Sequence, residues 1–90
     1  MTKVKENIKE KTLVLEEEVR KLVLYNDNVN TFDWVIECLM EVCHHTEEQA
    51  TQCAWIVHYK GRHPVLSGSF DYLVPRHNAL AERGLSVNIE

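Results

Sequence analysis

Proline, glycine and cysteine are scarce in this sequence, and it lacks any long hydrophobic run. Its 90 residues include two prolines, three glycines and three cysteines. Apolar runs such as 22–25 fall far short of the roughly 20 residues that cross a bilayer. No apolar segment follows the lysines of residues 1–6, as it would in a secretory signal. We therefore expect a chain that is neither exported nor inserted into a membrane, and a cytoplasmic location.

An excess of positive charge is also missing. Ten Lys and Arg residues stand against 14 Asp and Glu residues, which gives a formal net charge of -4. Without a basic stripe the chain offers no electrostatic surface for a phosphate backbone, so we expect no nucleic-acid partner. The cysteines Cys38, Cys43 and Cys53 are odd in number and form no C-x-x-C pair. This pattern favours reduced thiols over a disulfide framework.

The length allows one small domain and excludes a multidomain enzyme. An apolar fraction of 44% with 27% charged residues is ordinary for a folded globular domain. The sequence contains no glycine-rich phosphate loop, and Ser67-Gly68-Ser69 lacks the flanking residues of a nucleophile elbow. We therefore expect no cofactor and no catalytic residues.

The apolar patterns predict an α+β domain, residues 18–90, that follows a flexible N-terminal tail, residues 1–17. Three helices should pack on a small antiparallel sheet in the order strand, helix, helix, strand, helix, strand. The strands are expected at 20–25, 64–70 and 85–89, and the helices at 31–42, 46–61 and 72–83. Regular hydrogen bonding in the third helix should start only around Pro75, and Pro64 and Gly68 should mark irregular strand ends.

Capping residues indicate where the first two helices begin and end. Asn30, with Asp33 three residues later, is expected to cap the first helix. Thr46 and Gln49 form a capping box for the second helix. Gly61 supplies its left-handed C-terminal residue.

Two polar features are candidates for a functional site. Asn26, Asp27 and Asn28 follow the first strand, and His58 lies near the end of the second helix. Taken alone, the first group is more often a plain turn, and a histidine near a helix C-terminus is more often a favourable charge on the helix dipole.

A metal site is a further alternative. Cys43, His44 and His45 are adjacent. Structural zinc ligands usually come as C-x2-4-C and H-x3-5-H pairs, and neighbours on one turn point apart, so we expect no metal.

Two separated segments resemble the ClpS family. Residues 23–35 match a strand that ends in Asn-Asp-Asp and is followed shortly by a helix, and residues 48–61 match the family's second-helix motif with Val57-His58 and Gly61. A Gly-x-Phe follows at 68–70, and the resemblance runs from about Arg20 to Glu90. It implies an adaptor of the N-end rule, which binds proteins with a bulky hydrophobic first residue and delivers them to a Clp-family AAA+ unfoldase of the ClpA or ClpC type. The adaptor itself catalyses no reaction.

The resemblance also assigns roles to residues. Asn26, Asp27 and His58 match the residues that hold the free α-amino group, and Asn28 is a possible contact for the second residue of the substrate. The positions around the side-chain pocket are Asn30, Phe32, Val35, Ala54, Val57 and Leu85. Phe32 and Ala54 replace the methionines typical of the family.

A different class of function stays open at this point. The related fold of the ribosomal stalk protein's C-terminal domain suggests a structural interaction domain that does not read N-termini. Under the adaptor hypothesis, residues 1–17 should be dispensable for peptide binding and needed for delivery.

Overall fold

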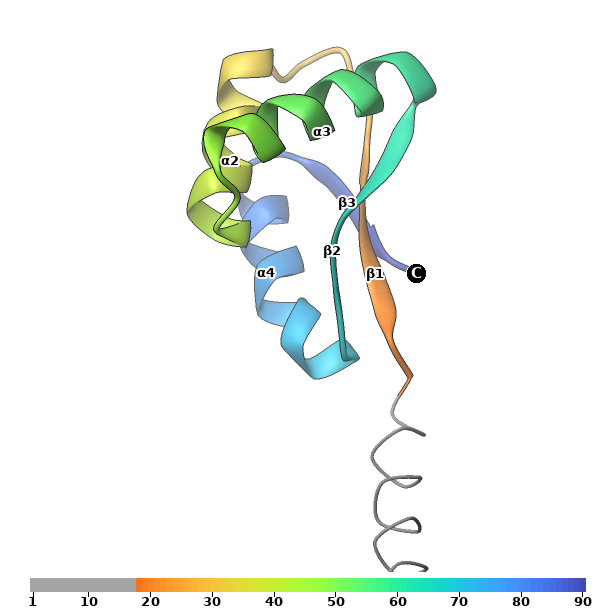
Figure 1. Ribbon diagram of the computed structural model, residues 1–90. Helices are drawn as coiled ribbons and strands as arrows, with labels where there is room; N and C mark the ends of the chain where they lie inside the picture. The colour runs from red at the N-terminus through yellow and green to blue at the C-terminus, as the bar shows by residue number, and fades with distance from the viewer. Residues whose placement is uncertain (1–17) are drawn as a thin grey trace, which may run out of the picture.

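A three-stranded sheet covered by helices makes up residues 18–90, the part of the chain that this computed structural model describes (Figure 1). The elements, in chain order, are β1 (Arg20–Tyr25), α2 (Phe32–Cys43), α3 (Glu47–Lys60), β2 (Arg62–Gly68), α4 (Phe70–Glu82) and β3 (Ser86–Ile89). This order confirms the predicted α+β class. The tail expected at 1–17 lies outside the described residues.

The central strand of the sheet is β1. It pairs antiparallel with β2 on one side and with β3 on the other. Its middle residues Leu22, Val23 and Leu24 are buried, because this strand has a neighbour on both edges. Leu22 and Leu24 point into the main core, where they meet helix residues such as Leu39 and Leu80. This packing fixes the position of the end of β1, and with it the position of the polar loop residues that follow.

The edge strand β2 differs from the prediction. We expected Pro64 at an irregular strand end, but it lies inside a strand that already begins at Arg62. The register shifts opposite Leu22 and Val23, which pair with Leu66 and Pro64 and leave Val65 as an extra residue. An edge strand tolerates a proline, since one side of its backbone needs no partner in the sheet. The bulge lets Val65 turn its side chain into the core.

The N-terminal cap of helix α2 lies one residue later than predicted. The Thr31 hydroxyl, not the Asn30 amide, accepts from the Trp34 backbone N–H at 3.1 Å. Asn30 does not serve as the cap because its side chain is engaged elsewhere in the loop. The capping box of Thr46 and Gln49 in α3 is present as predicted, with hydrogen bonds of 3.0 and 3.1 Å.

Helix α4 begins at Phe70, two residues before the predicted start, and it is regular well before Pro75, where we expected regular hydrogen bonding to begin. Ser69 caps the helix by accepting from the Tyr72 backbone N–H, and Phe70 is the first helical residue. Pro75 lies in the second turn, so the helix forgoes one backbone hydrogen bond there. The early start places Leu73 in the core, where it is fully buried, and this burial offsets the missing bond.

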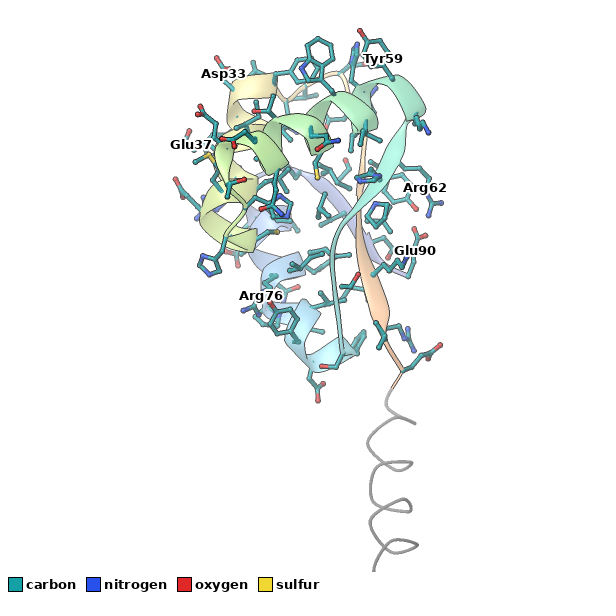
Figure 2. All side chains as sticks on the ribbon, in the orientation of Figure 1. Asp33, Glu37, Tyr59, Arg62, Arg76 and Glu90 are labelled. Carbon is teal, nitrogen blue, oxygen red and sulfur yellow. The ribbon has the colours of Figure 1, made fainter. Side chains whose placement is uncertain are left out.

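The helices lie over one face of the sheet (Figure 1). α4 packs against all three strands, α3 against β2, and α2 against both other helices. Asp33 and Glu37 of α2 point outward, away from this core (Figure 2). Within residues 18–90, every helix is too short and too polar to cross a membrane.

Candidate functional site

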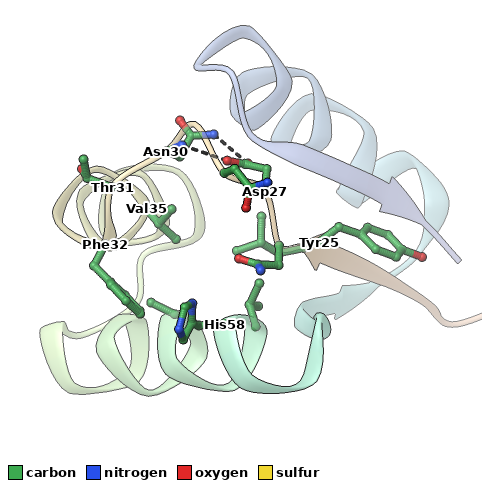
Figure 3. Close-up of a pocket in the computed structure, with 12 residues that line it drawn as sticks. Tyr25, Asp27, Asn30, Thr31, Phe32, Val35 and His58 are labelled. Carbon is green, nitrogen blue, oxygen red and sulfur yellow. Dashed lines mark hydrogen bonds between the residues drawn. The ribbon is translucent and has the colours of Figure 1, made fainter.

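A pocket opens where the end of β1, the loop 26–31 and the facing sides of α2 and α3 meet (Figure 3). Its volume of about 320 Å³ is at the small end of the range for ligand sites. A cavity of this size suits one amino-acid side chain better than a large cofactor.

The structure brings nine of the ten candidate residues together at this pocket. These lining residues are Asn26, Asp27, Asn28, Asn30, Phe32, Val35, Ala54, Val57 and His58. They come from three separate segments, the loop, α2 and α3, so only the fold places them side by side.

Leu85 is the candidate that the structure places elsewhere. It is 5% exposed and belongs to the main core cluster, and it is not among the residues that line the pocket. Its neighbour Gly84 does contact the loop through the backbone carbonyl. Leu85 is therefore a residue of the core and not of the pocket lining.

Three lining residues were missed by the sequence analysis. Leu24, Tyr25 and Thr31 also border the pocket. The side chain of Tyr25 points away from the cavity (Figure 3), and its hydroxyl donates to Glu90 on the outside of the sheet. Their position in the chain could have indicated them, since each directly precedes a candidate residue or another lining residue.

The Asp27 carboxylate organises the loop. Its Oδ1 accepts from the backbone N–H groups of Val29 and Asn30, and its Oδ2 accepts from the Asn30 side chain, each at 2.8 Å. Partial burial acts to raise the pKa of Asp27, but the hydrogen bonds from Asn30 and Val29 outweigh it and hold the pKa below its usual value. Asp27 is therefore ionised at neutral and mildly acidic pH.

Asn30 ties this loop to the turn between α4 and β3. Its Nδ2 donates both to Asp27 and to the carbonyl of Gly84, the latter at 2.9 Å. Close by, the indole N–H of Trp34 donates to the carbonyl of Arg83 at 3.0 Å. Gly84 has a φ of +88°, a left-handed conformation that favours glycine, and this directs the turn toward the loop. Two distant parts of the chain thus fix the upper wall of the pocket.

The pocket is lined by both polar and apolar side chains. Asn26, Asp27 and His58 contribute an amide, a carboxylate and an imidazole. Val35, Ala54 and Val57 contribute apolar side chains, and the last two are 4% and 5% exposed. Such an arrangement can accept hydrogen bonds from a cationic donor while it buries an apolar group.

The Phe32 side chain forms one wall beside His58 (Figure 3). Its ring centroid lies 5.2 Å from that of His58 and 4.7 Å from that of Trp55. Both partners belong to α3, so the phenyl ring packs against this helix.

The three residues of the metal alternative, Cys43, His44 and His45, do not form a cluster of metal ligands in the described part of the chain. Burial raises the pKa of Cys43 to about 11, so its thiol stays protonated and is a poor ligand or nucleophile. A ring nitrogen of His45 lies 2.7 Å from the Val65 carbonyl, and His44 is the exposed C-terminal cap of α2. No three side chains of metal-binding type come together within residues 18–90.

The described residues form a small α+β domain with a pocket lined by polar and apolar side chains. The chain belongs to the ClpS family, because residues 16–88 match the family model described as "ATP-dependent Clp protease adaptor protein ClpS".

Curated relatives agree with this assignment. The ClpS adapter protein of Acetivibrio thermocellus is 36% identical over 83 residues, which cover 82% of each chain. That of Campylobacter jejuni strain 81-176 is 40% identical over 52 residues, which are 58% of this chain and 54% of the relative. The matched part therefore spans about half the length of the Campylobacter relative.

A solved structure shares the fold. It is described as the structure of Agrobacterium tumefaciens ClpS2 bound to L-phenylalaninamide. The two chains superpose with a TM-score of 0.75 at 20% identity, over 82% of this chain and 96% of the other.

Asn30→Ala tests the anchoring of the loop. The substitution removes one hydrogen bond to the Asp27 carboxylate, worth about 1.5–3 kcal/mol, and one to the Gly84 carbonyl, worth about 0.5–1.5 kcal/mol, so the free energy of unfolding should fall by about 2–4.5 kcal/mol. Urea denaturation measures this change. Asn28→Ala, an exposed change in the same loop, is the matched control and should cost less than about 0.5 kcal/mol. Equal stabilities of the two variants would show that Asn30 does not anchor the loop.

Proposed function

We propose that this protein binds other proteins by their first residue and presents these proteins to a Clp-family AAA+ unfoldase. The first residue must have a free α-amino group and a bulky hydrophobic side chain. The observation that carries this proposal is one small pocket whose lining includes both hydrogen-bond acceptors and apolar side chains. We further propose that it acts in the cytoplasm as an adaptor without catalytic activity, like the relatives named adapter proteins.

The acceptors suit a protein N-terminus. A free α-amino group is an ammonium with three donors and needs acceptors that converge on it. An ionised carboxylate offers about four acceptor positions, of which Asp27 uses three within the loop. Its Oδ2 therefore keeps a position for the ammonium, alongside the Asn26 amide oxygen and an unprotonated nitrogen of His58. An acetylated N-terminus lacks both the charge and two of the donors.

The energies support a binding module of moderate affinity. Burial of a Leu or Phe side chain contributes about 1.5–3 kcal/mol, and each hydrogen bond to a charged group about 1.5–3 kcal/mol. After the costs of association, we expect a binding free energy of about -8 kcal/mol, which corresponds to a dissociation constant in the micromolar range. The ligand of the related ClpS2, L-phenylalaninamide, carries the same features: a free amino group and an aromatic side chain.

The direct test compares two fluorescent peptides of the same sequence that begin with phenylalanine, one with a free and one with an acetylated amino group. Fluorescence anisotropy should show at least tenfold tighter binding of the free peptide, because the loss of one charged hydrogen bond costs about 1.5–3 kcal/mol. Equal binding of both would instead support an interaction domain that does not read N-termini.

A second prediction concerns His58. A ring nitrogen of this residue would accept from the peptide ammonium, and alanine at this position offers no acceptor. His58→Ala should therefore weaken binding of the free phenylalanine peptide by about tenfold or more, since a hydrogen bond to a charged group is worth about 1.5–3 kcal/mol. Fluorescence anisotropy measures this loss.

His58→Gln keeps a neutral acceptor and should retain more of the affinity than His58→Ala. His44→Asn is the matched control, because asparagine tolerates the left-handed conformation of His44, and it should bind as tightly as the unmodified protein. Unchanged affinity in His58→Ala would remove His58 from the site.

A third prediction concerns the preferred first residue. Ala54 is buried against the pocket and leaves space that a methionine would fill, while the ring of Phe32 offers an aromatic wall. Leu would leave a cavity that costs about 24 cal/mol per Å³, whereas Phe, Tyr or Trp fill it. Aromatic first residues should therefore bind several-fold more tightly than Leu, as measured with otherwise identical peptides.

Ala54→Met should shift this preference back toward Leu. Gln52→Met adds the same side chain to an exposed position of α3 and should leave the preference unchanged. Leu bound as tightly as Phe by the unmodified protein would refute the wide pocket.

A further inference from the structure

Two large aromatic side chains are stacked on the outside of α3, one turn apart. The rings of Trp55 and Tyr59 have centroids 5.4 Å apart and planes inclined by 14°. They are 46% and 75% exposed, although burial of such rings normally stabilises a fold. We call this pair the aromatic shelf. Figure 2 shows Tyr59 at the upper end of α3, pointing away from the sheet.

The aromatic shelf is continuous with the pocket. Phe32, a pocket wall, lies 4.7 Å from Trp55 between ring centroids. His58, a polar lining residue, lies 5.2 Å from Tyr59 and 6.2 Å from Trp55. The shelf therefore begins where the pocket wall ends, with no intervening side chain between the rings.

We infer that the aromatic shelf is a second subsite, which holds an aromatic side chain of the second or third residue of a bound peptide. The inference rests on the proposed function, because it requires the first residue of that peptide to occupy the pocket. An extended chain advances about 3.3–3.6 Å per residue. The second and third residues of the peptide then lie about 3.5 and 7 Å from the first. The ring centroids are 4.7 Å apart from Phe32 to Trp55 and 5.4 Å apart from Trp55 to Tyr59, so each step is of the same order as one residue with its side chain.

The charges around the shelf favour a neutral aromatic side chain over a cationic one. The acidic residues of α3, Glu47 and Glu48, lie in its first turn, while Lys60 and His58 lie in its last turn beside Tyr59. Lys60 follows Tyr59 directly in the chain, so like charge near the rings would oppose the cation–π attraction of a peptide lysine. An aromatic ring gains the stacking without this repulsion.

The rings are also held in place before any ligand arrives. Trp55 contacts Phe32, His58 and Tyr59, so little side-chain entropy is left to lose on binding. A prearranged aromatic surface with this much exposed area is typical of a recognition surface.

The test uses three peptides with a free first phenylalanine, which continue as Ala-Ala, Trp-Ala or Ala-Trp and are otherwise identical. Anisotropy titrations should show that at least one tryptophan peptide binds about two- to tenfold more tightly than the Ala-Ala peptide. Tyr59→Ala should abolish this gain and leave the affinity for the Ala-Ala peptide unchanged, whereas Tyr59→Phe should keep the gain. Tyr72→Ala removes an exposed tyrosine from α4 and is the matched control.

The outcomes separate this inference from the proposed function. If the Ala-Ala peptide binds equally well with a free and an acetylated amino group, the proposed function fails. If the amino group matters but neither tryptophan peptide gains affinity, or if the gain survives in Tyr59→Ala, the aromatic shelf is not a subsite. A peptide with lysine at the second position that gains as much as tryptophan would overturn the preference for aromatic side chains.

Discussion

The hydrogen bonds of the Asp27 carboxylate are the interaction on which the pocket depends. A loop of six residues between β1 and α2 cannot bury a core of its own, so polar contacts must fix its shape. Asp27 supplies three of them, to Val29 and Asn30, and Asn30 extends the network to Gly84. The same carboxylate is thus both a structural anchor and a charged group at the mouth of the pocket. Because its ionised form makes these bonds, the loop is organised in the charge state that attracts a cation.

The sheet gives this loop its fixed starting point. The middle of β1 is buried and paired on both edges, so the chain leaves the sheet at Tyr25 in one direction. Outside the sheet, Tyr25 and Arg62 both contact the Glu90 side chain, whose backbone pairs with Lys21, so these contacts link β1 and β2 to the end of β3. The helices then contribute side chains from the other side. A rigid strand end facing two packed helices explains how a domain of this size can hold a cavity at all.

Local signals in the sequence predicted more than distant ones. The capping box of Thr46 and Gln49 lies within four residues and was predicted correctly. The order of the elements and the loop that follows β1 were also predicted correctly. Asn30 was misassigned as a helix cap because its partner Gly84 is 54 residues away, and no local pattern reveals that contact. Pro75 was misjudged for a similar reason, since the burial of Leu73 against the sheet outweighs a local helix breaker. The position of Leu85 in the core likewise depends on packing between distant elements.

The polar and the apolar side chains that line the pocket differ in how sharply they could discriminate between ligands. A ligand without hydrogen-bond donors would cover the exposed acceptors of Asn26 and His58 and leave them unpaired, which is costly. An apolar wall distinguishes one hydrocarbon shape from another only weakly, by about 1–3 kcal/mol per methylene. The polar side chains should therefore set which class of ligand binds, and the apolar side chains should only rank members of that class. Phe32 and Ala54, which depart from the family pattern, are apolar lining residues, so we expect them to affect this ranking more than the class of ligand.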